Sequence, residues 1–214
     1  MQLTRLIRLL EITRSMPQTG YALSEIRKEE LSDLAQHHYL VTAIAWQLAR
    51  AAIRAGGKLD LARVLEFSLI HDLGEVFGGD IGMPYARAND EARTAAKRFE
   101  AINQQYLAQF FGEDEQYVTK LSEEILDAKS DEAVVAKIAD YMEVTHYKLY
   151  LRRLTPNDGA MAREIIAKKL DQLGDPTTER ILRDIAEQWA AELEQPTEEL
   201  FDRYKAPAEI TTSS

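Results

Sequence analysis

Two strong metal-ligand residues, His71 and Asp72, stand side by side at the end of the apolar segment 61–70. His37 lies on an apolar stripe upstream, and Asp140 lies on another downstream. Two imidazoles and two carboxylates from separate helices form a ligand set that divalent metals accept. A pair of buried aspartates is costly unless a cation compensates it. The residues therefore predict a metal-dependent hydrolase.

Helical periodicity points these side chains toward one interior. His37 shares an apolar stripe with Val41 and the residues one and two turns beyond. Asp72 follows apolar residues at helical spacing, and Asp140 follows Ala136, a small residue that lets its helix approach closely. An ordinary hydrogen-bonded core would also explain an inward histidine and a His-Asp pair.

The chain reads as helical nearly throughout, and its glycines and prolines mark the gaps. We expect helices around 6–12 and over about 29–55, 60–73, 90–111, 114–128, 132–154, 158–173 and 177–204, with loops at 17–21 and 78–84. No segment shows the strict alternation of a strand. The expected fold class is all-α.

Composition excludes several classes of protein. The chain has 214 residues, 45% of them hydrophobic and 29% charged, as expected of one soluble domain with at most an added helical layer. The absence of cysteine excludes disulfides and thiolate zinc sites and fits a cytoplasmic protein. A net charge of −10 argues against binding to duplex nucleic acid.

Two further expectations concern partners. No apolar stretch is long enough to span a bilayer, so we expect no membrane partner. The long amphipathic helices offer more apolar surface than one small core consumes, so we expect a homodimer.

The chain resembles the HD-domain metal-dependent phosphohydrolases, and among them the 5′-nucleotidase branch that cleaves deoxyribonucleoside 5′-monophosphates. The matching residues are His37, the pair His71-Asp72 with Glu75 after it, the Gly-Asp-Ile-Gly-Met-Pro loop at 79–84, Asp140, and Pro-Gln-Thr-Gly-Tyr at 17–21. The order, spacing and loop together are specific, although no single part is. The match covers about the first 150 residues.

The resemblance implies an HD-domain helical bundle with additional C-terminal helices. We expect a core at 1–155 that carries the resemblance, a helical extension packed on it at 156–206, and a disordered tail at 207–214. The resemblance also implies that the four ligands bind one divalent metal ion. Mixed nitrogen and oxygen ligation suits Mn, Co, Fe, Ni or Zn better than Mg.

The resemblance also implies roles for two acids: Glu75 would polarise the attacking water, and Asp80 would protonate the leaving ribose oxygen. Three residues are candidates for substrate binding. Tyr21 could stack on a base, Arg14 could contact the phosphate, and Gln18 stands where the family often has a phosphate-binding arginine.

The predicted function is hydrolysis of nucleoside 5′-monophosphates, with a preference for deoxyribonucleotides, to nucleoside and phosphate. A non-catalytic HD module that binds a nucleotide is the first alternative. A di-iron oxygenase of HD type is the second, although four histidines are few for that ligand set. Glu75 and Asp80 argue against the binding module, because binding alone does not need them.

Overall fold

The computed structural model describes residues 3–194. Within them the chain is helical, and the only β pairing is an isolated bridge between Pro17 and Asp33. The described α-helices are α1 (Leu3–Ile12), α2 (Leu34–Arg54), α3 (Leu61–Ile70), α4 (Met83–Ala88), α5 (Asp90–Ala108), α6 (Glu115–Asp127), α7 (Asp131–Tyr150), α8 (Pro156–Leu170) and α9 (Pro176–Glu192). The predicted all-α fold class is confirmed. None of the described helices combines the length and the hydropathy needed to cross a bilayer.

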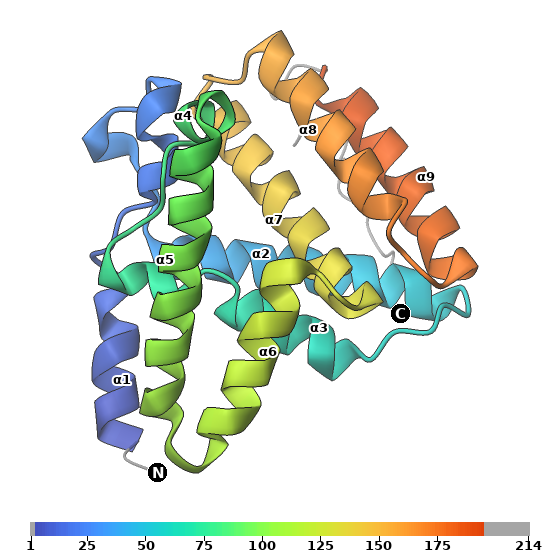
Figure 1. Ribbon diagram of the computed structural model, residues 1–214. Coiled ribbons are helices and arrows are strands. Elements are labelled where there is room, and N and C mark those ends of the chain that lie inside the picture. Colours follow the sequence, from blue (N-terminus) through green and yellow to red (C-terminus); the bar gives the residue numbers. More distant parts are fainter. Residues whose placement is uncertain (1–2, 195–214) are drawn as a thin grey trace, which may run out of the picture.

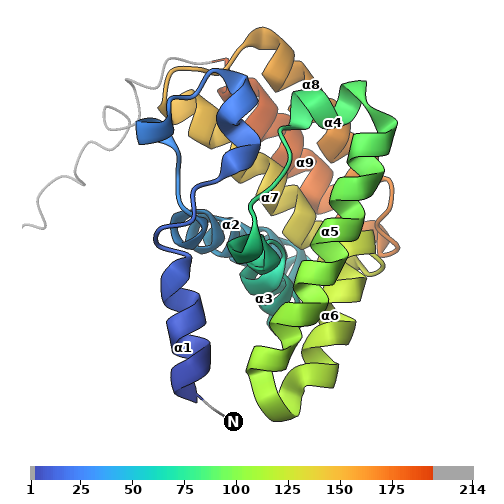
Figure 2. The same ribbon diagram turned by 60° about the vertical axis from the view of Figure 1, so that its left-hand side comes forward.

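Helix α7 is central to the arrangement. It packs against α2 and α3, which cross it, and α8 and α9 follow beside it as successive neighbours (Figure 1). Helices α5 and α6 form a hairpin whose tip points to the same end of the molecule as the start of α1 (Figure 2). This arrangement brings the first turn of α2, the end of α3 and the middle of α7 to one place.

Side-chain caps set the starts of these three helices. The Asp33 carboxylate accepts a hydrogen bond from the Gln36 backbone N–H at 2.8 Å, so α2 begins at Leu34 and not near residue 29 as predicted. The segment before it forms a separate 3₁₀ turn, Lys28–Glu30. Asp60 and Ser130 cap α3 and α7 in the same way. Such caps satisfy backbone N–H groups that have no partner within the helix.

Five helices share one apolar core. It includes Val41 and Ala49 of α2, Val64 of α3, Ile138 of α7, Ile166 of α8 and Leu182 of α9, all buried. Alanines of α2 and α7 line it, and small side chains let helices approach closely. Helices α8 and α9 therefore complete the core of α2, α3 and α7. The domain division predicted at residue 155 stays a prediction, and the predicted tail at 207–214 lies outside the described residues, as does the predicted helix beyond residue 194.

The segment after α3 turns sharply. The chain leaves α3 at His71, forms the 3₁₀ turn η3 (Leu73–Phe77), and reaches Gly79, which has a φ of +75°. A Cβ at Gly79 would lie 2.5 Å from the Thr19 hydroxyl oxygen, so both the backbone angle and the contact require glycine. The short helix α4 follows, with a proline in its first turn. The sequence did not predict α4, which is too short to show periodicity.

Candidate metal centre

The four predicted metal ligands lie together. Donor atoms of His37, His71, Asp72 and Asp140 are all within 4.8 Å of one another. The His37 Nε2 atom is 3.1 Å from His71 Nε2 and 3.5 Å from one oxygen of each aspartate. Both imidazoles are 1% exposed, and the aspartate side chains keep 14–15% exposure, so the cluster is enclosed but still reached by solvent at the aspartates. This is the donor set that the sequence predicted.

Hydrogen bonds fix which imidazole nitrogens face the cluster. His71 Nδ1 is 2.9 Å from the Ser68 carbonyl oxygen, which only accepts, so Nδ1 carries the proton. His37 Nδ1 is 2.7 Å from a Glu143 carboxylate oxygen and donates to it. In neutral rings both Nε2 atoms then present lone pairs to each other. Two lone pairs at that separation require a positive charge between them, and the donor set fits a divalent transition metal.

The pKa shifts agree with a site built for a cation. Burial lowers the pKa of His71 to about 3, so its imidazole is neutral, as a metal ligand must be. Burial also opposes protonation of His37, but its hydrogen bonds to Asp72 and Glu143 raise its pKa well above the ordinary value. Without a metal, a proton on His37 would supply the missing positive charge.

Lys137 is a site residue that the sequence analysis missed. Its Nζ is 3.7 Å from Asp72 Oδ1 and 3.8 Å from Asp140 Oδ2, the oxygens that point away from the imidazoles. Burial opposes its charge, but the two aspartates outweigh burial and raise the pKa of Lys137. Each aspartate thus turns one oxygen to the imidazoles and one to the ammonium. Lys137 lies three residues before Asp140 on the same helical face, and this spacing was the signal in the sequence that could have identified it.

Glu75 lies in η3, one turn beyond the His-Asp pair. Its Oε2 is enclosed and has no hydrogen-bond partner among the described residues. Burial, followed by the charges of Asp72 and Asp80, raises the pKa of Glu75 well above its ordinary value. An enclosed carboxylate oxygen without a partner is costly unless something absent from the chain contacts it.

Asp80 stands on the exposed turn after η3. Partial desolvation of its carboxyl raises its pKa to about 6, and the charges of Asp72 and Asp140 add to the rise. The Ile81 backbone N–H donates to the carboxylate at 2.6 Å and opposes the shift. A carboxyl with this pKa can hold a proton close to neutrality, as a general acid requires.

Glu100 of α5 is a third acid near the centre. Burial raises the pKa of Glu100 to about 7, while Lys137 lowers it and the aspartates of the site raise it. The sequence analysis missed Glu100 because α5 is polar over most of its length and a single glutamate gives no signal there.

The three predicted substrate contacts lie in different settings. Tyr21 is 4% exposed, packs its ring on Tyr147, and directs its hydroxyl to Glu143, so it has no open face on which a base could stack. Arg14 is largely exposed and pairs with Glu11 at 3.0 Å. These placements correct the stacking role of Tyr21 and leave Arg14 without a contact to the cluster. Gln18 is 6% exposed, and its side-chain Nε2 has no partner within the described chain.

His38 is buried beside the cluster but lies outside the ligand group. Its ring meets His71 edge to face, with centroids 5.0 Å apart, and its Nε2 has no partner within the described residues. Burial lowers the pKa of His38 well below the ordinary value. It flanks the ligands without joining them.

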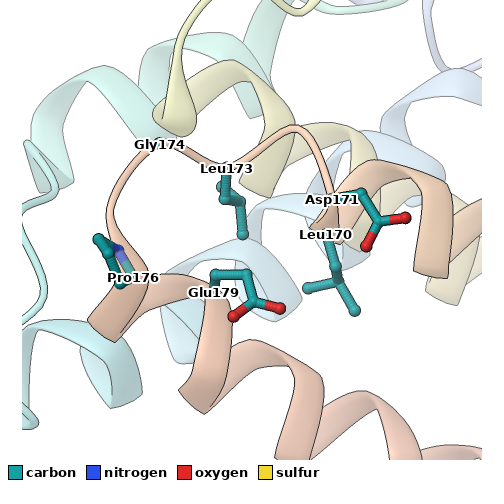
Figure 3. Close-up of a pocket in the computed structure, with 6 residues that line it drawn as sticks. All are labelled: Leu170, Asp171, Leu173, Gly174, Pro176 and Glu179. Carbon is teal, nitrogen blue, oxygen red and sulfur yellow. The ribbon is translucent and has the colours of Figure 1, made fainter.

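A hollow at the turn between α8 and α9 offers no comparable chemistry (Figure 3). Its two carboxylates, Asp171 and Glu179, both pair with Arg183, at 2.8 Å and 2.5 Å. The remaining lining consists of Leu170, Leu173, Gly174 and Pro176. The metal cluster is therefore the candidate functional site.

The helical fold and the cluster of two histidines and two aspartates define the class: an all-α domain with a candidate divalent-metal centre. A family model described as HD domain matches residues 10–181. The chain belongs to the HD-domain family. The matched region runs past residue 155 into α9.

Solved structures share this fold. A conserved hypothetical protein from Pyrococcus furiosus aligns with a TM-score of 0.66 and 24% identity, covering 87% of this chain and 98% of that one. A protein from Pyrococcus horikoshii OT3 aligns with a TM-score of 0.65 and 22% identity, covering 87% and 97%. No curated protein matches the chain. The HD-domain resemblance is confirmed, while the 5′-deoxynucleotidase branch stays a prediction.

Proposed function

We propose that this HD-domain protein is a metal-dependent phosphomonoesterase that hydrolyses nucleoside 5′-monophosphates, with a preference for deoxyribonucleotides. The observation that carries the proposal is the convergence of two Nε2 atoms and two carboxylate oxygens within 4.8 Å, with both imidazole Nδ1 atoms already hydrogen-bonded. His37, His71, Asp72 and Asp140 would hold one ion of Mn, Co, Fe, Ni or Zn. Such an ion polarises a phosphoryl group and lowers the pKa of a water molecule.

The two acids have complementary positions. The unpartnered Oε2 of Glu75 can accept a hydrogen bond from a water molecule beside Asp72 and orient it toward phosphorus. Asp80, whose pKa is about 6, can hold the proton that the leaving ribose oxygen needs. Burial raises the pKa of both acids, so the two proposed roles are distinguished by position, Glu75 beside the ligand pair and Asp80 on the exposed turn.

The charge around the centre supports a small anion over a large one. Lys137 is a cation beside both aspartates, while Glu75, Asp80 and Glu100 are three more carboxyl groups close by. Their raised pKa values indicate that the site disfavours additional negative charge. A metal ion and one lysine can neutralise a single phosphate. The extra charge of a triphosphate would be repelled, so we expect monophosphates to be preferred.

The test compares kcat/KM for dAMP, AMP, 3′-AMP and dATP, with the protein loaded in turn with Mn, Co, Ni, Zn and Mg. The proposal expects turnover of dAMP and AMP, little of 3′-AMP or dATP, and better activity with the transition metals than with Mg. A preference for dATP would identify a triphosphohydrolase. No turnover with any metal would favour the alternative of a nucleotide-binding module.

A further inference from the structure

A buried carboxylate supports one metal ligand from behind. Glu143 is 2% exposed, and its Oε2 lies 2.7 Å from Nδ1 of His37. It occupies α7 three residues after Asp140, so the same helix supplies a ligand and the support of another ligand. A carboxylate on the far nitrogen of a metal-binding histidine fixes the ring and makes it a stronger donor.

The same carboxylate oxygen is reached from the N-terminal side of the chain. The Tyr21 hydroxyl points at Glu143 Oε2 from 3.5 Å, a long hydrogen bond, and burial raises the pKa of Tyr21 well above its ordinary value, so the hydroxyl stays protonated. Tyr21 belongs to the 3₁₀ turn η1 (Thr19–Ser24). Tyr147 packs on the Tyr21 ring and donates its own hydroxyl hydrogen to the Glu30 carbonyl.

Thr19, two residues earlier in η1, holds a different part of the site. Its hydroxyl accepts from the Asp80 backbone N–H at 2.8 Å and donates to the Asp80 carbonyl at 3.0 Å. Gly20 lies so close that a Cβ there would be 3.3 Å from the Asp80 carboxylate. One hydroxyl therefore satisfies both backbone groups of the residue to which we assign the proton-donor role.

We propose that η1 is a positioning element for the metal centre, holding the ligand His37 through Tyr21 and Glu143 and holding the backbone of Asp80 through Thr19. The inference rests on the proposed function, because it assigns these contacts to a metal site and a proton donor. The Pro-Gln-Thr-Gly-Tyr stretch at 17–21 would then position residues of the site without binding the metal itself. This role replaces the expected contact of Tyr21 with a base.

The contacts of η1 form two arms: the Glu143 arm, from Tyr21 through Glu143 to His37, and the Thr19 arm, from Thr19 to the backbone of Asp80. We expect different effects from them, because only the Glu143 arm leads to a metal ligand. Loss of the Glu143 arm weakens metal binding, and loss of the Thr19 arm leaves metal binding intact but lowers kcat. A contact that only stabilised the fold would lower the melting temperature without separating these two quantities.

The Glu143 arm is tested by titrating Co²⁺ into metal-free protein by calorimetry and by recording the visible Co²⁺ spectrum. We expect Glu143→Ala to weaken Co²⁺ binding by about 10–100-fold. Glu143→Gln should lose less, because an amide oxygen still accepts from His37, and it serves if the alanine variant does not fold. Tyr21→Phe should lose least, since its contact is long. Tyr147→Phe, the same chemical change at a hydroxyl that donates to the Glu30 carbonyl and not to Glu143, should bind as the parent does.

The Thr19 arm is tested by Thr19→Val, which removes the hydroxyl at nearly constant volume. We expect unchanged Co²⁺ affinity, a lowered kcat on dAMP, and recovery of kcat in Thr19→Ser. A parent protein that binds no Co²⁺ would overturn the proposed function itself. If folded Glu143→Ala and Glu143→Gln bind Co²⁺ as tightly as the parent does, the positioning role alone is overturned. The same conclusion follows if Thr19→Val has the parental kcat.

Discussion

His37 and His71 face each other through Nε2 atoms 3.1 Å apart, while each ring donates its Nδ1 proton to an acceptor behind it. Glutamate behind one ring and a backbone carbonyl behind the other leave both Nε2 atoms as acceptors. Two facing acceptors are repulsive unless a positive charge lies with them. The carboxylates of Asp72 and Asp140 complete a set that concentrates negative potential at one point.

Glu75→Ala should retain the metal and lose most turnover. If Glu75 assists the attacking water, the loss in kcat is about 10²–10⁴-fold, the range typical of general acid–base residues. Metal content by elemental analysis and kcat on dAMP are measured on the same preparation. The assignment fails if the variant hydrolyses dAMP at the parental rate, and Glu91→Ala at the exposed start of α5 is the control.

Asp80→Asn should change the pH dependence of stability in the metal-free protein. The pKa of Asp80 is raised to about 6 in the fold, so the folded state binds more protons than the unfolded state between the ordinary aspartate pKa and about 6. Its contribution to stability is therefore present at low pH and is lost as pH rises through 6. The variant removes that loss, so it should be more stable than the parent at pH 8 and gain little at pH 4.

The control for this prediction is Asp184→Asn, an exposed position on α9 with a side chain 68% exposed. Urea unfolding at both pH values gives the free energies. If the difference in unfolding free energy between Asp80→Asn and the parent is the same at pH 4 and pH 8, the pKa of the Asp80 carboxyl is not raised in the fold.

Lys137→Met should make the thermal stability of the protein depend more strongly on bound metal. The ammonium is the cation that faces the outer oxygens of Asp72 and Asp140, and methionine keeps the length of the side chain without the charge. Metal-free protein should lose stability because the outer oxygens of two partly buried carboxylates then lack their cationic partner. The rise in melting temperature on adding Mn²⁺ should consequently be larger than in the parent, and KM for dAMP should increase. An unchanged rise would contradict this role for Lys137.

Ile166→Ala tests whether α8 belongs to the same cooperative unit as the metal site. Ile166 is 1% exposed in the core shared by five helices. A large-to-small change at such a site costs about 2–5 kcal/mol of unfolding free energy. We expect a single unfolding transition shifted to lower urea, followed equally by Trp46 of α2 and Trp189 of α9 in single-tryptophan variants. Two separate transitions would indicate an independent C-terminal layer, the division predicted at residue 155.

Sequence reasoning brought the four ligands together because each lies on an apolar helical stripe, and such stripes face a common core. It missed Lys137 and Glu143, although both flank Asp140 at a spacing of three residues on α7. Charged side chains usually lie on a solvated face. Only the contacts with distant segments, Asp72 with Lys137 and His37 with Glu143, show that these two residues are enclosed. The inward direction of the Tyr21 hydroxyl likewise depends on contacts between distant segments, which local periodicity does not contain.

The most direct test of the central claim is metal analysis combined with phosphate release for the parent and Asp72→Ala, with exposed Asp127→Ala on α6 as the matched control. Protein stripped with a chelator is reloaded with Mn²⁺ or Co²⁺, dialysed, and assayed on dAMP. The account predicts about one ion per chain and metal-dependent phosphate release for the parent and the control, with both lost in Asp72→Ala. Equal metal content and equal phosphate release in Asp72→Ala and the parent would contradict it.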